Sequence, residues 1–554
     1  MGNAAPRPLP AITVGVVGHR SDRIENAARV KERLAELITM IGAELPNDGP
    51  DGGKRLRLFS ALAEGTDRLG ATAAREAGVA LDVVLPFPAD EYRNDFETGE
   101  SRDAFGDLLA NADCVLVLDG KTTARERAYE AAGQAMLDNI DLLLAVWDGE
   151  PGRGRGGTHD LLEEAVRRDM LILTVSPDGE TVALRAPQTD VQGKVRLADI
   201  PATSVEALPD YIRSITGLHA RGEPEWLSDP LPPASGWVYA AYPLLLRLAG
   251  VGPKRQKGAA QPAAPPATVL HAAFDWWDGA ANAAARAFRS AVIVNFALAA
   301  LAVVLAAFSV LVGDEKWIFV VIEIVTIGLL LLNTWYAGRQ KWQERWLESR
   351  EVAELLRVSI LLRQVGIGRG MADSEDSGWS TRYVGALARA TPPVPVDLSE
   401  TKTLSPAVEA EIENQATWNE ATTHRMHLAA HRIERFGEVL FVAVLGLAVA
   451  WLALWIANPH AAKALKYWLT ALTAGLPAIA TASYGIRIIL DFEGIAGRAH
   501  RLACALRASL NQWRSIEPSA ASLQAFVGQA AKAMIGDINS WRLLAEGRRL
   551  AVPG

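Results

Sequence analysis

The sequence predicts an α/β Rossmann-like parallel sheet domain followed by an α-helical membrane region with four transmembrane helices in two hairpins. Residues 10–220 alternate short apolar runs with helix-like stretches, which is typical of a parallel sheet. The second half contains four long apolar runs, and about 20 residues at 1.5 Å each cross a hydrocarbon layer of about 30 Å. The runs are residues 290–312, 317–337, 437–457 and 467–490.

The totals exclude several classes of protein. The 554 residues are enough for about two to four domains, and a net charge of −8 gives no sign of a nucleic-acid-binding protein. The two cysteines, Cys114 and Cys504, fall in a predicted strand and a predicted helix, so we expect no disulfide framework, and no Cys/His spacing predicts a zinc site. Residues 1–10 lack a basic stretch followed by an apolar core, so we expect no signal peptide and a cytosolic α/β domain.

The elements of the first half follow one another as strand and helix. Strands separated by helices imply a parallel sheet with right-handed crossovers, and such sheets bind ligands beyond the carboxyl ends of their strands. The expected strands are residues 12–17, 55–59, 81–85, 112–118, 141–147 and 171–175. The expected helices include residues 24–41, 158–168 and a helix that ends at residue 77.

Three glycine-containing turns lie at those carboxyl ends. Free N–H groups and the dipole at a helix start suit an anion, so the turns together predict a site for a phosphate-bearing small molecule. The alternative is that each glycine only serves its own turn, and that His19 caps a strand end instead of contacting a ligand. The turns contain Gly18, His19 and Arg20, then Glu64, Gly65, Thr66 and Asp67, and finally Gly156, Gly157 and Thr158, which Arg153 and Arg155 precede.

These turns resemble the SLOG superfamily of Smf/DprA-like and LOG-like Rossmann-type domains. The resemblance covers roughly residues 10–220 and rests on the segments 15–20, 60–67 and 156–158, in this order. It implies a nucleotide or NAD-derived ligand. LOG-like hydrolases carry a glutamate three residues after the motif threonine, whereas this chain has Leu161 there and its carboxylates at Glu163 and Glu164. This departure favours binding without turnover.

An enzymatic alternative stays open. On the same fold, a LOG-like nucleotide N-glycosidase would use Glu64 and Asp67 as acid and base groups and Arg20 as a phosphate anchor.

The segments around the apolar runs suggest the domain boundaries and the orientation. Residues 221–270 are rich in proline and alanine and predict a linker, within which the short apolar stretch 237–248 should lie on the membrane surface or pack on the soluble domain. Residues 371–407 form a polar excursion between a first hairpin region, 271–370, and a second, 408–554. Arginines flank the runs away from the short turns, so both termini should be cytosolic.

The two hairpin regions look like a duplication. A shift of 148 residues places Tyr336 on Tyr484, Arg339 on Arg487 and Arg350 on Arg498. The segments 346–350 and 353–357 resemble the helix that follows the hairpin in SLATT domains, and the pattern 541–553 is similar. These two-transmembrane modules accompany SLOG domains in bacterial conflict systems. A usual module has one hairpin, so two in tandem suggest a pseudo-dimer within one chain.

Glu323 is the one carboxylate well inside a predicted span. An ionised group there costs about 2.5–3.5 kcal/mol on insertion scales, so it should face the helix bundle or water. Ser309 and Thr473 should lie near its depth and are possible partners. Glu323 is either a functional residue of a pore or gate, or a structural residue that stabilises helix packing. In the second case its carboxyl group is neutral or reaches toward the membrane interface.

The sequence therefore predicts a membrane-anchored sensor and effector in the bacterial cytoplasmic membrane. Its α/β domain would bind a nucleotide-derived signal, and its hairpins, in a homo-oligomer, would gate or permeabilise the bilayer. The resemblance implies a role in antiviral defence. The alternatives are the membrane-anchored N-glycosidase and a membrane scaffold or transporter without nucleotide input.

Overall fold

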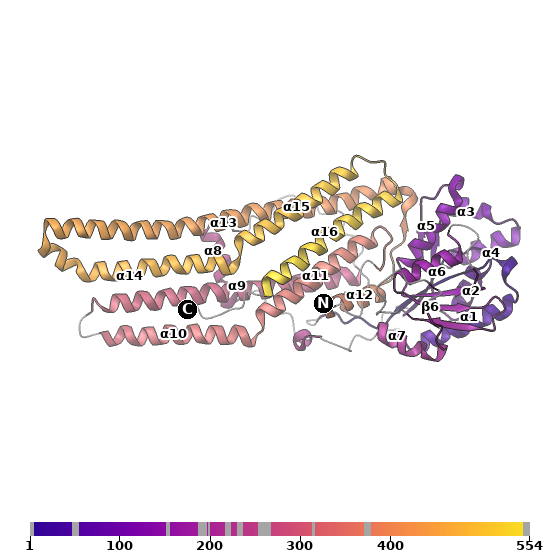
Figure 1. The fold of residues 1–554 in the computed structure, drawn as a ribbon, viewed down its shortest axis with the longest axis horizontal. Helices are drawn as coiled ribbons and strands as arrows, with labels where there is room; N and C mark the ends of the chain where they lie inside the picture. The colour runs from indigo at the N-terminus through magenta and orange to yellow at the C-terminus, as the bar shows by residue number, and fades with distance from the viewer. Residues whose placement is uncertain are drawn as a thin grey trace.

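The computed structural model of the chain is elongated, with a sheet domain at one end and two pairs of long helices at the other (Figure 1). It describes residues 5–46, 55–150, 156–186, 197, 200–216, 223–229, 236–252, 268–312, 316–369 and 378–546. The α/β domain followed by a helical membrane-like region agrees with the fold class that the sequence predicts.

The sheet has eight strands in the order β7-β6-β5-β1-β2-β3-β4-β8. Every pair of neighbours from β6 through β8 in this order is parallel. The edge strand β7 is antiparallel to β6. The strands are β1 (Ile12–Gly18), β2 (Leu56–Ser60), β3 (Ala80–Leu85), β4 (Cys114–Val117), β5 (Leu142–Val146), β6 (Leu171–Val175), β7 (Val182–Arg185) and β8 (Val396–Asp397). The first six confirm the six predicted strands.

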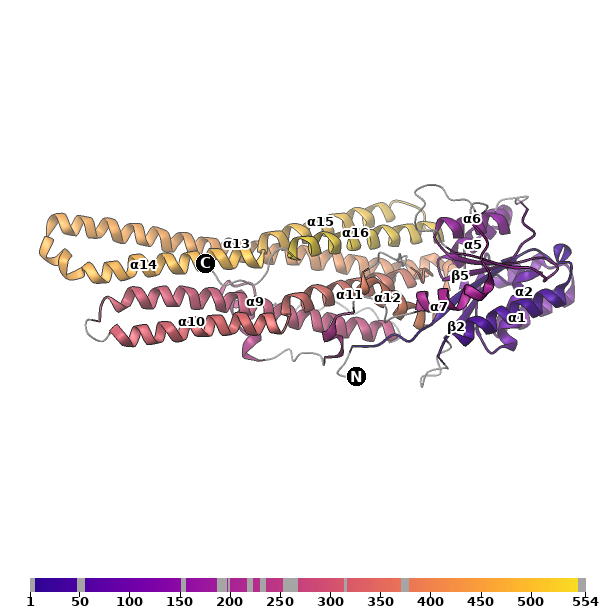
Figure 2. The ribbon, with the colours of Figure 1, turned by 60° about the horizontal axis from the view of Figure 1, so that its bottom comes forward.

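Helices cover both faces of the sheet, as parallel strands require. α1, α2, α4 and α7 pack on one face, and α5 and α6 pack on the other (Figure 2). In α1 the buried residues Val30, Leu34, Leu37, Ile38 and Ile41 recur at helical spacing and form the stripe that faces the sheet. The helices are α1 (Ala27–Ala43), α2 (Thr66–Glu76), α3 (Ala89–Tyr92), α4 (Gly99–Ala110), α5 (Arg125–Leu137), α6 (Thr158–Arg167) and α7 (Leu208–Thr216).

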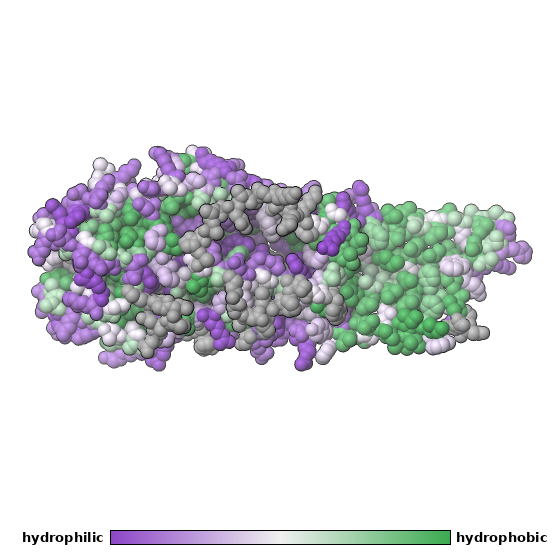
Figure 3. Space-filling model, turned by 180° about the vertical axis from the view of Figure 1, so that it is seen from behind, coloured by the Kyte–Doolittle hydropathy of each residue, from purple (hydrophilic) through white to green (hydrophobic). Residues whose placement is uncertain are grey.

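Four helices in the described part of the chain are long and apolar enough to cross a membrane. The predicted spans fall in α9, α10, α13 and α14, and Figure 3 shows their end of the molecule covered by apolar side chains. Residues 313–315 of the first predicted turn lie outside the described residues. The helices are α8 (Ala241–Leu248), α9 (Val269–Ser309), α10 (Lys316–Arg339), α11 (Trp342–Arg363), α12 (Trp379–Ala390), α13 (Thr401–Ala457), α14 (Pro459–Leu490), α15 (Phe492–Trp513) and α16 (Ala520–Glu546).

The two hairpins repeat one arrangement beyond their spans. Lys341 follows α10 and Asp491 follows α14, and each residue has a left-handed backbone, with φ of 50° and 52°. Each then starts a helix of 22 residues, α11 or α15. These hinges lie 150 residues apart. The shift that aligns the two hinges is therefore 150 residues, two more than the shift of 148 residues inferred from the tyrosines and arginines.

The short helix α8 packs at the base of the spans. The Tyr242 N–H donates to Ser290 Oγ of α9 at 3.1 Å, and Arg432 of α13 donates to the Ala249 carbonyl at 2.5 Å. The expectation that this stretch packs on the soluble domain is therefore wrong. Leu244 and Leu248 are 54% and 78% exposed, which is compatible with the alternative, a position at a membrane surface.

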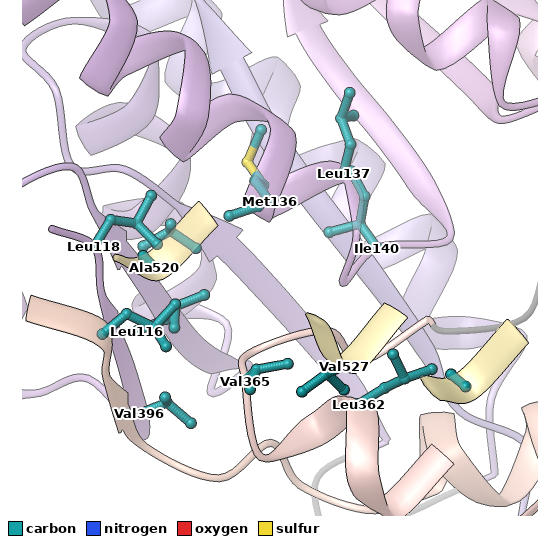
Figure 4. Packing of buried hydrophobic residues seen from close by; sticks show 14 of the residues in the cluster. Leu116, Leu118, Met136, Leu137, Ile140, Leu362, Val365, Val396, Ala520 and Val527 are labelled. Atoms are coloured by element: carbon teal, nitrogen blue, oxygen red, sulfur yellow. The ribbon is translucent and has the colours of Figure 1, made fainter. Parts of the chain in front are cut away.

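The sheet domain and the helical region share one hydrophobic core (Figure 4). β8 comes from the segment expected to be a polar excursion and pairs with β4, with Val396 opposite Leu116. Its two residues are too few to show an alternating pattern, so this strand could not be predicted. The core joins Leu116, Leu118, Met136, Leu137 and Ile140 of the sheet domain with Leu362, Val365, Val396, Ala520 and Val527.

Candidate functional site

The carboxyl ends of β5, β1 and β2 meet where the strand order reverses. β1 has β5 on one side and β2 on the other, so the chain leaves these strands toward helices on opposite faces of the sheet. A crevice at such a reversal is the usual ligand site of an open α/β sheet. The turns after β1, β2 and β5, here called the carboxyl-edge site, are the three turns singled out in the sequence.

The first two turns touch each other through their glycines. A Cβ at Gly65, where φ is +98°, would lie 2.5 Å from the carbonyl oxygen of His19, and a Cβ at Gly18 would lie 2.4 Å from Thr66 Oγ1. The Thr66 N–H and hydroxyl both donate to the His19 carbonyl, at 3.1 and 3.0 Å. These glycines therefore serve the close packing of the two turns, and the donors of Thr66 are already used.

His19 joins the first turn to the third. Its side chain is buried, and its Nε2 lies 3.1 Å from the Asp148 backbone nitrogen and 3.2 Å from the Asp148 carboxylate. Burial lowers the pKa of His19, although the nearby Asp148 carboxylate acts in the opposite direction. Asp148 in turn binds Arg23. His19 is therefore a neutral residue that fixes the β5 turn against the β1 turn.

The two acidic residues of the second turn hold local structure. Asp67 is buried and accepts backbone N–H groups of Ala61 and Ala63, and burial raises its pKa to about 7. Glu64 accepts a hydrogen bond from the Ser101 hydroxyl, which also accepts one from Arg68 at 2.7 Å. Both carboxylates thus close the loop after β2, and Asp67 is in addition an acid that titrates near neutral pH.

Arg20 is an exposed cation at this edge. Its guanidinium has no hydrogen-bond or ion-pair partner among the residues that the structure describes, and it lies close enough to Asp67 and Tyr129 to influence their pKa values. An exposed planar guanidinium with free donors is suited to bidentate binding of a phosphate. Of the predicted site residues, Arg20 is the one best placed to meet a ligand.

The third turn is only partly described, because Arg153 and Arg155 lie outside the described residues. Gly156 has φ of +76°, and a Cβ there would lie 3.0 Å from the Glu130 backbone nitrogen of α5. Its N–H donates to the Asp160 carboxylate at 3.0 Å. Gly157 precedes α6, and Thr158 is its first residue. The absence of a side chain at Gly156 thus allows the turn to pack closely against α5.

The carboxylates near this turn are engaged elsewhere. Leu161, at the position of the LOG glutamate, is buried, and a Cβ on Gly133 of α5 would lie 2.4 Å from its side chain. Glu163 accepts the Leu197 N–H at 3.1 Å. Glu164 binds Arg167 and Arg168. Leu161 has no carboxylate, and the carboxylates of Glu163 and Glu164 are both bound in the arrangement described.

A cluster of side chains from α3, α4, α5 and the segment between α3 and α4 was not identified from the sequence. Asp95 accepts hydrogen bonds from Tyr129 and Arg125 at the start of α5, and Arg68 lies 4.2 Å over the Phe96 ring. Aromatic side chains pack edge to face around Tyr92. The closely spaced aromatic residues at 87, 92 and 96 were the available signal. This cluster holds the first turns of α5, where Tyr129 is close enough to Arg20 for the two to interact electrostatically.

The polar groups of the spans also differ from expectation. Glu323 is half-buried on α10, whereas Ser309 and Thr473 each donate to a carbonyl of their own helix, at 2.7 Å. Asn295 of α9, 1% exposed, donates to Thr334 at 2.8 Å and accepts from Asn333 at 2.7 Å. The spans therefore contain a polar contact besides Glu323. Amide and hydroxyl groups at this α9–α10 contact were hidden by their apolar surroundings in sequence.

Comparison with known proteins adds no relative. No protein-family model matches the chain, and no curated protein matches its sequence.

Proposed function

We propose that the chain is a membrane-anchored sensor and effector. Its α/β domain binds a nucleotide-derived, phosphate-bearing small molecule at the carboxyl-edge site, and its hairpins respond by gating or permeabilising the bilayer. The observation that carries this proposal is the hydrophobic core that the sheet domain shares with the helical region. A change of packing in one part has to be accommodated by the other, because close-packed cores transmit displacement.

Two contacts connect the site with the helices. α5 begins at Arg125 and Tyr129 beside Arg20, and ends at Met136 and Leu137 in the shared core. Asp119, in the turn after β4, accepts the Ala520 N–H at the start of α16 at 2.7 Å. A ligand phosphate bound by Arg20 would therefore act on a helix whose far end packs against the helical region.

The energetic requirement is modest. A ligand shifts a conformational equilibrium only by its difference in affinity for the two states, typically about 1–3 kcal/mol for each coupled site. Several subunits of a homo-oligomer acting together would sharpen the response. The resemblance to SLOG and SLATT domains adds a bacterial cytoplasmic membrane and antiviral defence as the setting of this proposal.

The test is dye release from liposomes that contain the full-length protein. Cyclic and NAD-derived nucleotides are added one at a time, and binding is measured in parallel by calorimetry. We expect one ligand class to bind and to release dye. Arg20→Gln should weaken binding at least about tenfold, because a charge-assisted bidentate contact is lost. Arg75→Gln, which removes an exposed arginine paired with Asp107 on the same domain, is the matched control.

A second variant separates binding from output. Asp119→Ala removes the acceptor that the start of α16 uses, so it should leave ligand affinity unchanged and reduce dye release. If no nucleotide binds the protein, or if binding never changes release, the proposal is wrong.

A second candidate function is nucleotide N-glycosidase activity. The observation that favours it is Asp67, a buried carboxyl group in the site whose pKa is raised to about 7 by burial, a value suited to general acid catalysis. Product analysis after incubation with nucleoside monophosphates and NAD decides between the two. Free base released by the wild type and not by Asp67→Asn would support the enzyme, and intact substrate would exclude it.

A further inference from the structure

A second polar region lies at the opposite, amino edge of the sheet, between the sheet domain and the helical region. It surrounds a cavity of about 50 Å³. Strand-side residues line one wall, and residues of α11, α12 and the turn after α11 line the other. Its charged lining residues are Arg57 and Asp141 from the sheet side, and Arg363, Arg369 and Arg389 from the helical side.

Two of the four arginines that line the cavity, Arg57 and Arg389, form ion pairs with carboxylates of the described residues. Arg57 binds Asp82 through two hydrogen bonds, of 2.7 and 2.5 Å. Arg389 lies 3.7 Å from Asp141, whose other oxygen accepts the Thr13 hydroxyl at 2.7 Å. The cavity therefore has its negative charges already assigned.

Arg363 and Arg369 are held by backbone carbonyl groups. Arg363 donates to the Thr391 and Pro392 carbonyls, at 2.8 and 2.6 Å, and Arg369 donates to the Ile140 carbonyl at 3.1 Å. Within the described ranges neither guanidinium forms an ion pair with a carboxylate. Among the described lining residues and their ion-pair partners, there are thus two more positive than negative charges once each ion pair is counted as neutral.

Burial makes this excess charge unfavourable unless an anion accompanies it. Arg363 is buried, and burial lowers its pKa to about 10. Arg369 Nε is buried and has no hydrogen-bond partner. An unsatisfied donor beside uncompensated charge at a cavity is the environment that an oxyanion would satisfy.

The size of the cavity limits the anion. One water molecule needs roughly 10–15 Å³ of free space by the same measure, so about 50 Å³ has the room of a few oxygen atoms. A nucleotide does not fit in this space. We propose that the cavity binds one small tetrahedral oxyanion, inorganic phosphate or sulfate, between Arg363 and Arg369 at the junction of the sheet domain and the helical region.

This site is separate from the carboxyl-edge site, because it lies at the other end of the same strands. Its charged groups come from both parts of the molecule, so the bound anion stabilises the junction. We expect phosphate to tighten the contact through which a signal would pass. The inference does not depend on the identity of the nucleotide ligand.

The test uses full-length protein in detergent, purified without phosphate or sulfate. Calorimetry and thermal unfolding are followed during titration with sodium phosphate or sodium sulfate, with ionic strength held constant by sodium chloride. We expect saturable binding of one anion per chain and a higher Tm. Arg369→Gln should weaken binding at least about tenfold, because one charge-assisted contact is lost. Arg213→Gln, an exposed arginine paired with Asp210, is the control.

Two further measurements keep the result decisive. Arg369→Lys retains the positive charge without the planar fork, so it should keep the fold and bind phosphate more weakly than the wild type does. AMP should fail to displace phosphate in the Arg20→Gln variant. The proposal is overturned if phosphate and sulfate raise the Tm no more than chloride does, if Arg369→Gln binds phosphate as the wild type does, or if AMP competes for the cavity.

Discussion

The buried pair of Arg57 on β2 and Asp82 on β3 supports a prediction that can be worked through in numbers. The side chains are 7% and 1% exposed, and Nε and Nη2 of the arginine meet both carboxylate oxygens. Removal of one partner leaves an uncompensated buried charge, which costs about 3–5 kcal/mol. Arg57→Met and Asp82→Leu should each destabilise the sheet by this amount.

The double variant should behave differently from the sum of the two. With both charges replaced by apolar side chains of similar size, no desolvated ion remains, so the cost should fall to within about 1–2 kcal/mol of the wild type. The double-mutant cycle therefore predicts a coupling energy of several kcal/mol between two side chains that are hydrogen-bonded across neighbouring strands.

Hydrogen exchange measured by mass spectrometry on the full-length protein is the appropriate assay. Peptides that cover Leu56–Ser60 and Ala80–Leu85 report the local opening of β2 and β3. A cost of about 3–5 kcal/mol raises the exchange rate by about a hundredfold to a few thousandfold, at 1.4 kcal/mol for each factor of ten. If the free-energy costs of the two single variants add in the double variant, so that their rate increases multiply, the reasoning is refuted. Phosphate-free buffer keeps the neighbouring cavity from contributing.

Three further outcomes follow from single residues. Gly65→Ala places a Cβ 2.5 Å from the His19 carbonyl at a φ of +98°, so it should cost more than about 1 kcal/mol in thermal unfolding, whereas Gly99→Ala, with free space around it, should change little. Asp67 should contribute a stability that is lost as pH rises from about 4 to about 7, because the folded protein keeps the Asp67 proton up to a pKa of about 7 and the unfolded chain releases it near 3.8. Asp67→Asn should flatten this dependence, and an unchanged slope would contradict the assignment. Asn295→Ala removes hydrogen bonds between α9 and α10 and should cost about 0.6–2 kcal/mol in mixed-micelle unfolding, with Asn282→Ala on the exposed face of α9 as the control.

The strands and the spans were predictable because their signals are local. β5 is a run of five buried apolar residues, and each span is a long apolar run, so composition over a short window is sufficient. β8 was not predictable, since Val396 joins the sheet through a partner, Leu116, that is far away in sequence. A two-residue strand carries no periodic pattern of its own.

The carboxyl-edge site was predictable in outline and not in the roles of its residues. The topology of a parallel sheet brings the ends of β1, β2 and β5 together, so the order of the turns was enough to find the place. That Gly65 serves packing on His19, and that His19 is fixed by Asp148, depends on contacts between distant segments. The same applies to the arginines of the amino edge, which come from β2, α11, the turn after α11 and α12.

The shared core also determines where the chain can be cut. A fragment of residues 10–220 would leave Leu116, Leu118 and Ile140 without the side chains of α11 and α16 that cover them, and β4 without its neighbour β8. An uncovered apolar face beside an unpaired strand edge promotes aggregation. A soluble version suitable for crystallisation therefore has to retain Val396–Asp397 and the parts of α11 and α16 that pack in the shared core. It is better obtained by replacing the two hairpins with short loops than by truncation.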